Sequence, residues 1–238
     1  MKKLLITLLV VCLLPISRVQ ALDNDVTPNA KSAILIEANS RQILYDKNAE
    51  EKLYPASTTK IMTMILMFEA LRNKKISFDD EITTSKYAAS MGGSQVYLEV
   101  GESLSLKDMF KSIAIASAND ASVAVAEHIA GSINKFVEMM NDKAKKLGLK
   151  NTHFKNATGL HDPDHYTCAH DLAIMAAYLI EIGGEDLFAV TSLYDSYIRE
   201  DTKQSFWLVN TNKLLKSYNG VDGLKTGYTK EAGYCLVT

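Results

Sequence analysis

The stretch Pro55-Ala-Ser-Thr-Thr-Lys-Ile-Met-Thr-Met-Ile-Leu-Met-Phe-Glu-Ala-Leu71 decides how this chain is organised. From Ile61 onward, apolar side chains point to nearly every side of a helix, and this pattern is typical of a helix that is buried all round. A helix of this kind usually forms the axis of a domain. We therefore predict a central buried helix over residues 57–73.

Strands are predicted near both ends of the chain, with helices between them. A hairpin is expected from residues 33–38 and 41–45 around the turn Asn39-Ser40, and two further strands from 220–228 and 233–238 around a turn at 229–232. Helices are predicted over 106–116, 119–130, 133–147 and 171–182, the last two ending at Gly148 and at Gly183-Gly184. The pattern indicates a mixed α/β (α+β) fold, with one antiparallel sheet built from both chain ends and a helical subdomain inserted between them.

Composition excludes several classes of protein. The 238 residues carry 26 Lys and Arg against 28 Asp and Glu, and 47% are hydrophobic, as in a globular domain. Collagen-like, disordered and multi-span membrane proteins are excluded. The balanced charge offers no general attraction to nucleic acid, which is not expected as a partner.

The first 21 residues have the three parts of a secretory signal. Lys2 and Lys3 precede an apolar run from Leu4 to Ile16, and Val19-Gln-Ala21 suits a signal peptidase. Thirteen apolar residues are few for an uncleaved anchor, which is the alternative. Cleavage after Ala21 leaves 217 residues of net charge −5, so we expect an extracytoplasmic domain over 22–238.

Two cysteines, Cys168 and Cys235, remain in that domain. They form neither a disulfide framework nor a set of metal ligands, and a single bridge between them is left open.

Ser57 and Lys60 open the buried helix and are separated by three positions, which places them on one face. A buried amine has a lowered pKa and can act as a general base, which makes the serine a nucleophile. Backbone N–H groups at the helix start suit an anionic intermediate. The alternative is an ordinary helix-capping serine, and the same spacing recurs at Ser132 and Lys135, where an amphipathic helix favours that simpler interpretation.

Two other short patterns carry chemistry. Ser117 and Asn119 lie on a short connection between helices, where a hydroxyl can relay a proton and an amide can hold a carbonyl; helix capping is the alternative. Lys225-Thr-Gly227 lies in a predicted strand, where a lysine beside a hydroxyl suits a carboxylate and glycine permits close approach. A surface edge strand is the alternative there.

Together these patterns occur in the order Ser-x-x-Lys, Ser-x-Asn, Lys-Thr-Gly, a set typical of penicillin-binding proteins and class A β-lactamases. Over its whole mature length the chain resembles the low-molecular-weight penicillin-binding proteins that are serine-type D-alanyl-D-alanine carboxypeptidases. The blocks that carry this resemblance are 54–60, 117–120, 156–161, 169–172 and 222–229. The resemblance implies a β-lactamase/transpeptidase-like fold.

The resemblance also implies a role for each site residue. Ser57 is the acylated nucleophile, Lys60 its base and Ser117 a proton donor to the departing D-alanine, while Asn119 orients the substrate. Lys225 and Thr226 hold the substrate carboxylate, and the N–H groups of Ser57 and Tyr228 form the oxyanion hole. The expected partners are peptidoglycan stem peptides and β-lactam antibiotics as covalent inhibitors, with no metal or organic cofactor.

Proteins of this family usually continue into another sheet strand, a C-terminal helix and a small β domain with a membrane-binding amphipathic helix. Since the last predicted strand stops at Thr238, we expect a C-terminally truncated product, whose full-length form contacts the membrane surface only through the region absent here.

Two other function classes are open to the same sequence. His161, Asp162, Asp164, His165 and His170 cluster within ten residues and could bind a metal, although Pro163 breaks any helical register. The favoured interpretation of that cluster is a polar loop beside the active-site cleft. A non-catalytic binding protein on the same scaffold is the second alternative, against which the intact Ser57 and Lys60 pair argues.

Overall fold

A computed structural model describes residues 25–200 and 202–238. The chain divides into two compact units, Met1–Ala30 and Lys31–Thr238, and all elements below belong to the second. The predicted signal segment 1–21 lies outside the described residues. Within the described ranges, no helix has both the length and the apolar character that crossing a membrane requires.

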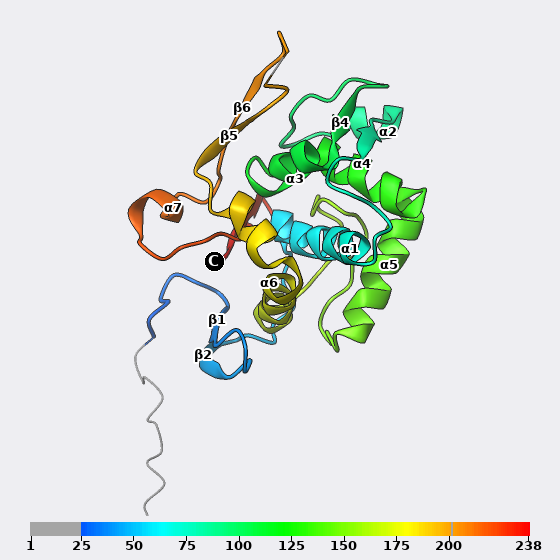
Figure 1. The fold of residues 1–238 in the computed structure, drawn as a ribbon. Helices are drawn as coiled ribbons and strands as arrows, with labels where there is room; N and C mark the ends of the chain where they lie inside the picture. Colours follow the sequence, from blue (N-terminus) through cyan, green and yellow to red (C-terminus); the bar gives the residue numbers. More distant parts are fainter. Residues whose placement is uncertain (1–24, 201) are drawn as a thin grey trace, which may run out of the picture. The chain divides into compact units, whose positions relative to one another are not determined.

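The predicted buried helix is the centre of the second unit (Figure 1). A 3₁₀ turn, η2 (Ala56–Thr59), leads directly into α1 (Lys60–Arg72), whose residues from Lys60 to Phe68 are all buried. Helices α3 (Leu106–Ala114), α4 (Asn119–Ala130), α5 (Ile133–Lys146) and α6 (Ala169–Thr191) all contact α1. An apolar helix is stable here because neighbours cover each of its sides.

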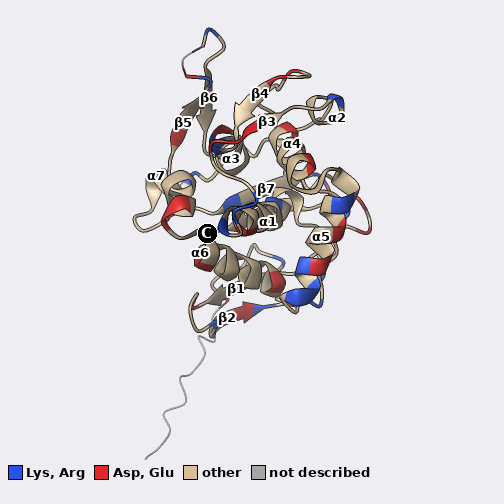
Figure 2. Cartoon of the chain, turned by 45° about the vertical axis from the view of Figure 1, so that its right-hand side comes forward, with Lys and Arg blue, Asp and Glu red and all other residues tan. Residues whose placement is uncertain are grey.

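Local sequence signals explain how α5 begins and ends. The Ser132 hydroxyl accepts a hydrogen bond from the N–H of Lys135, and the last turn is rich in lysine, which suits the negative end of the helix dipole. Figure 2 colours the basic and acidic positions along this helix. The second Ser-x-x-Lys pattern, Ser132 with Lys135, is therefore a helix cap on an amphipathic helix, and the simpler interpretation is confirmed.

Helix α6 continues beyond the stop predicted at Gly183-Gly184. Its backbone leaves helical geometry at Gly184 (φ 51°, ψ −136°), and helix resumes as far as Thr191. Leu187 is fully buried after the break, so packing of the second segment outweighs the local cost of glycine. The predicted end is a kink.

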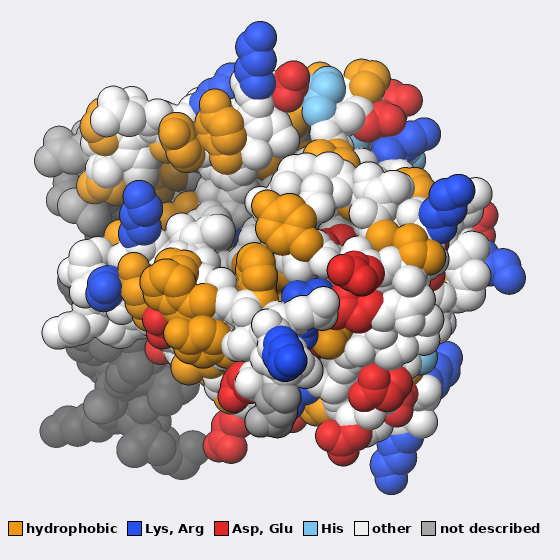
Figure 3. Space-filling model, turned by 90° about the horizontal axis from the view of Figure 1, so that it is seen from above, with side chains coloured by type: hydrophobic (Ala, Val, Ile, Leu, Met, Phe, Trp, Pro, Cys, Tyr) orange, Lys and Arg blue, Asp and Glu red, His pale blue; other side chains and the backbone are white. Residues whose placement is uncertain are grey.

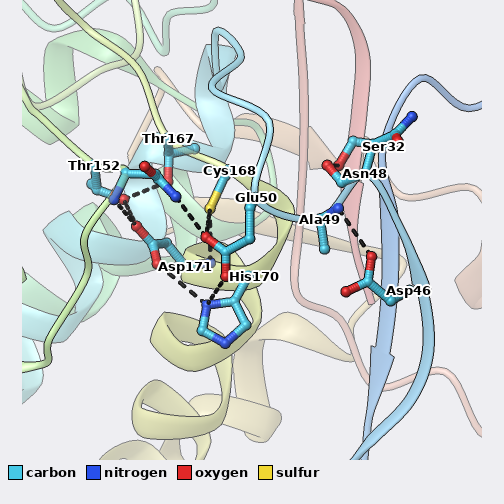
Figure 4. Close-up of polar contacts among 11 residues, drawn as sticks. Ser32, Asp46, Asn48, Ala49, Glu50, Thr152, Thr167, Cys168, His170 and Asp171 are labelled. Carbon is cyan, nitrogen blue, oxygen red and sulfur yellow. Dashed lines mark hydrogen bonds and ion pairs between the residues drawn. The ribbon is translucent and has the colours of Figure 1, made fainter.

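A polar cluster holds the start of α6 (Figure 4). Asp171 is buried, and one of its carboxylate oxygens accepts hydrogen bonds from the Asn151 N–H at 2.8 Å and the Thr152 hydroxyl at 2.7 Å. Cys168 caps the helix through its sulfur, and His170 approaches Glu50 at 3.6 Å. Both Cys168 and Cys235 are free thiols, so the bridge left open by the sequence is not formed in this structure.

In the residues that the structure describes, the strands form antiparallel pairs. The outer two, β1 (Ala33–Ile36) with β2 (Ile43–Lys47) and β7 (Lys225–Thr229) with β8 (Gly233–Val237), match the hairpins expected at the chain ends. Two more, β3 (Glu81–Thr83) with β4 (Ser103–Ser105) and β5 (Asp195–Ile198) with β6 (Phe206–Val209), were not predicted as pairs, nor were the short helices α2 (Lys86–Ala89) and α7 (Leu214–Ser217).

The mixed α/β class is confirmed, but the expected single sheet needs correction. Among the described residues, the hairpins from the two chain ends share no ladder of backbone hydrogen bonds and form separate two-stranded sheets. They are related instead through α6, which packs against both β1 and β8. Side-chain packing on a helix, rather than strand pairing, connects them.

Candidate active site

Ser57 and Lys60 meet at the junction of η2 and α1. The Lys60 Nζ atom lies 3.0 Å from the Ser57 hydroxyl oxygen, 2.7 Å from the Asn119 side-chain oxygen and 2.7 Å from the Thr158 carbonyl oxygen. A neutral amine has two N–H donors and one lone pair. Asn119 and Thr158 can accept both protons, which leaves the lone pair directed toward the Ser57 hydroxyl.

The surroundings of Lys60 favour that neutral form. Its side chain is fully buried. Burial lowers the pKa of Lys60 well below its usual value, the positive charge of Lys225 lowers it further, and the carboxylate of Asp120 acts in the opposite direction. A lysine in this state can accept a proton near neutral pH.

Strand β7 brings Lys225 and a close-packed backbone to the same place. Lys225 is buried, and burial lowers its pKa to about 7. At Gly227 a β-carbon would lie 2.8 Å from the backbone nitrogen of Ser57, so only glycine lets the strand approach this closely. On the same strand, the Thr226 hydroxyl donates a hydrogen bond to the Thr211 hydroxyl at 2.6 Å, and the Tyr228 ring lies 4.7 Å from the ring of Tyr234.

A loop before α4 holds Asn119 in position. The Asn119 side-chain amide donates to the Gly92 carbonyl at 2.7 Å, and its backbone N–H donates to the Ser94 carbonyl at 2.7 Å. Asp120, the next residue, is buried and accepts hydrogen bonds from backbone N–H groups of the same loop. Ser117 has a left-handed backbone (φ 63°), a strained conformation that occurs preferentially at functional sites.

The face that carries the β5–β6 hairpin exposes several hydrophobic side chains (Figure 3). Tyr97 and Trp207 are more than half exposed, and the ring of Tyr97 lies 6.0 Å from that of Phe206 in an edge-to-face arrangement. Arg199 fixes this hairpin to the chain before α3 through an ion pair with Glu102 and a hydrogen bond to the Val96 carbonyl.

Sequence reasoning identified the charged and hydroxyl side chains but missed their supports. No role was assigned to the Thr158 carbonyl, which binds Lys60, although residues 156–161 had been identified as a block of the family pattern. A backbone acceptor leaves no signal in side-chain chemistry. The glycines at 159 and 93 are the available sequence signal. In the structure both have positive φ and approach the site closely, which glycine permits.

The metal-binding alternative is not assembled. Within the part of the chain that the structure describes, no three His, Cys, Asp or Glu side chains are arranged to hold an ion. His165, a member of the proposed cluster, instead points inward and contacts the Thr59 hydroxyl.

Comparisons with known proteins identify the family. The family model described as D-alanyl-D-alanine carboxypeptidase matches residues 18–238. The chain is 57% identical over 213 residues to the D-alanyl-D-alanine carboxypeptidase DacF of Bacillus subtilis. The aligned region covers 90% of this chain and 54% of that protein. The chain thus spans about half the length of the curated relatives it matches.

Solved structures show the same fold. The D-alanyl-D-alanine carboxypeptidase DacD of Francisella tularensis superposes with a TM-score of 0.82 at 29% identity, over 87% of this chain and 62% of that one. Penicillin-binding protein D2 of Listeria monocytogenes, in its ampicillin-bound form, superposes with a TM-score of 0.75 at 31% identity. The match covers 87% of this chain and 82% of that one. The chain therefore belongs to the D-alanyl-D-alanine carboxypeptidase family of peptidases.

Proposed function

We propose that this protein is a serine-type D-alanyl-D-alanine carboxypeptidase that removes the terminal D-alanine from peptidoglycan stem peptides. The observation that carries the proposal is the contact of 3.0 Å between the amine of a fully buried lysine, Lys60, and the hydroxyl of Ser57. Such a pair is arranged for nucleophilic catalysis. The names of the relatives support the same reaction.

The reaction proceeds by acyl transfer. Neutral Lys60 takes the proton of the Ser57 hydroxyl as its oxygen attacks the carbonyl carbon of the penultimate D-alanine. The carbon–nitrogen bond then breaks, and the terminal D-alanine leaves after its amine receives a proton through Ser117. Water attacks the resulting ester, releases the shortened peptide and restores the hydroxyl.

The other site residues bind and orient the substrate. The Asn119 amide holds a substrate carbonyl, and Lys225 with Thr226 holds the terminal carboxylate. The backbone N–H groups of Ser57 and Tyr228 stabilise the negative oxygen of the intermediate; the close packing of Gly227 on the Ser57 nitrogen supports this assignment. β-Lactam antibiotics acylate the same serine. The ampicillin-bound relative supports that expectation.

We assign residues 22–238 to this peptidase domain and residues 1–21 to a signal peptide, which makes the protein extracytoplasmic and gives it a role in cell wall remodelling. The predicted signal pattern and the reaction agree, since peptidoglycan lies outside the cytoplasmic membrane.

Release of D-alanine from a peptide ending in D-alanyl-D-alanine tests the proposal. The wild-type protein is expected to release D-alanine, and Ser57→Ala to release none. Ser132→Ala is the matched control, because Ser132 has the same spacing to a lysine but only caps α5. A binding protein on this scaffold retains the peptide without releasing D-alanine, and that result would overturn the proposal.

A further inference from the structure

One loop, residues 156–165, packs against the turn that carries Ser57 and Lys60. The Thr158 carbonyl accepts a hydrogen bond from Lys60, and the Ala157 carbonyl accepts one from the Thr63 hydroxyl at 2.8 Å. At Gly159 a β-carbon would lie 1.8 Å from the Ala56 carbonyl oxygen. The loop therefore touches the turn before Ser57, the base itself and the first turn of α1.

His165 ends this loop and extends its contact to Thr59. The imidazole is 2% exposed, and its Nε2 atom lies 2.8 Å from the Thr59 hydroxyl oxygen. Its Nδ1 atom accepts a hydrogen bond from the backbone N–H of Lys155 at 3.1 Å. Since Nδ1 is the acceptor, the neutral ring carries its proton on Nε2 and donates it to Thr59.

Thr59 lies between the two reacting residues. It follows Ser57 by two positions and directly precedes Lys60, within η2, and its hydroxyl is buried. A hydrogen bond to this hydroxyl limits the rotation of the short turn on which the Ser57 oxygen and the Lys60 nitrogen are mounted. The ring is itself held by edge-to-face packing on Phe154, with centroids 5.6 Å apart.

We propose that His165 is a positioning residue for acylation, which holds the Ser57–Lys60 turn in its reactive geometry through the hydrogen bond from Nε2 to Thr59. His165 touches neither of the two reacting side chains, so it acts through Thr59. The inference rests on the proposed function, and it gives a role to a histidine that the sequence analysis placed in a polar loop, with metal binding as the alternative.

Two amide substitutions separate the two hydrogen bonds of the ring. His165→Gln is long enough to place an N–H near the position of Nε2 and so keeps a donor for Thr59. His165→Asn ends near the position of Nδ1, keeps an acceptor for Lys155 and loses the donor. Thr59→Val removes the other partner of the same bond with little change of shape and leaves His165 in place.

The measurement is single-turnover acylation by a fluorescent penicillin, which separates the initial dissociation constant from the acylation rate constant. We expect His165→Asn and Thr59→Val each to lower the rate constant by about tenfold or more, as small misplacements of reacting groups do. The dissociation constant is expected to stay unchanged, and His165→Gln to restore most of the rate. The double variant His165→Asn with Thr59→Val is expected to be no slower than either single variant.

Other outcomes overturn the inference. If folded His165→Asn and Thr59→Val acylate as fast as the wild type, or if Gln and Asn are equally slow, the hydrogen bond to Thr59 does not position the turn. A rate constant from a single turnover does not depend on how much protein is folded, so a loss of thermal stability alone does not imitate the expected result. Failure of the wild-type protein to be acylated would count against the proposed function instead.

Discussion

Two buried lysines, Lys60 and Lys225, lie in the candidate active site, and their surroundings differ. Lys60 has three oxygen neighbours, one of them the nucleophile, and a pKa lowered by burial and by Lys225. The Lys225 amine donates to the Thr226 carbonyl at 3.0 Å. We therefore propose that Lys60 takes a proton from Ser57 and that Lys225 binds an anion.

Replacing Lys60 with arginine tests the role of base. A guanidinium keeps the positive charge but does not release its proton at accessible pH. We expect the acylation rate of Lys60→Arg to fall by a factor of about 10²–10⁴. In the wild type, the rate is expected to rise with pH and to level off well below the usual pKa of lysine. A Lys60→Arg rate within a few fold of the wild type would rule Lys60 out as the base.

The acylation rate is expected to rise with pH, but binding of a carboxylate through Lys225 is expected to weaken. Lysine is positive below its pKa, and burial lowers the pKa of Lys225 to about 7. Affinity for a ligand with a carboxylate is therefore expected to weaken as pH rises through about 7. Comparing the initial binding of a penicillin with that of its methyl ester isolates this effect, because the ester has no carboxylate to interact with the Lys225 charge. Equal pH profiles for the two ligands would contradict this role.

At the scale of elements, loop 156–165 is pressed against η2 at a position where only glycine fits. Gly159 (φ +86°) and Gly148 (φ +74°) have similar backbones, but a β-carbon at Gly148 meets nothing within 4 Å. Gly148→Ala is expected to cost about 1 kcal/mol, the strain of the conformation alone. Gly159→Ala must also displace the Ala56 carbonyl, and we expect a loss of about 3 kcal/mol or more. Urea unfolding of both variants measures the difference, and equal losses would show that the loop yields without cost.

The elements that the sequence predicted are those with strong periodic or terminal signals. Helix α1 is apolar on all sides, α5 has a serine cap and a lysine-rich end, and β7 with β8 encloses a short turn. Strands β3 and β4 have only three residues each, too few for an alternating pattern to stand out. Pairing of β5 with β6 joins segments that flank a seven-residue polar-rich connection without a hairpin turn signal, so tertiary contacts such as Arg199 with Glu102 decide it.

The candidate site was predictable in its chemistry and not in its supports. Ser57, Lys60 and Asn119 do converge, as their residue types and spacing suggested. Their placement depends on carbonyl groups of Thr158 and Gly92, and every residue has a carbonyl. His165 was visible as a histidine, but only the fold shows that its ring faces Thr59.

At the scale of the whole molecule, His165 makes the stability depend on pH. Burial lowers its pKa from 6.5 to about 4; Asp162 opposes this shift, and His153 and His161 add to it. The unfolded chain binds a proton below about 6.5 and the folded protein only below about 4. This contribution to stability is therefore complete above pH 6.5 and is lost as pH falls toward 4, an effect of about 3 kcal/mol.

Urea unfolding at about pH 7 and about pH 4.5 checks this expectation. The wild type is expected to lose more stability between the two than His165→Gln, which has no titrating group at this position. The comparison cancels the carboxylates, which titrate in both proteins. An identical loss in both proteins would show that His165 is not held neutral in the fold.

The most direct test of the central claim, that Ser57 activated by buried Lys60 is the nucleophile, is the site of covalent attachment of penicillin. Intact-mass measurement followed by peptide mapping is expected to find one penicillin per chain, on Ser57, with no adduct in Ser57→Ala and a normal adduct in Ser132→Ala. An adduct that survives Ser57→Ala, or folded wild-type protein that forms none, would contradict the account.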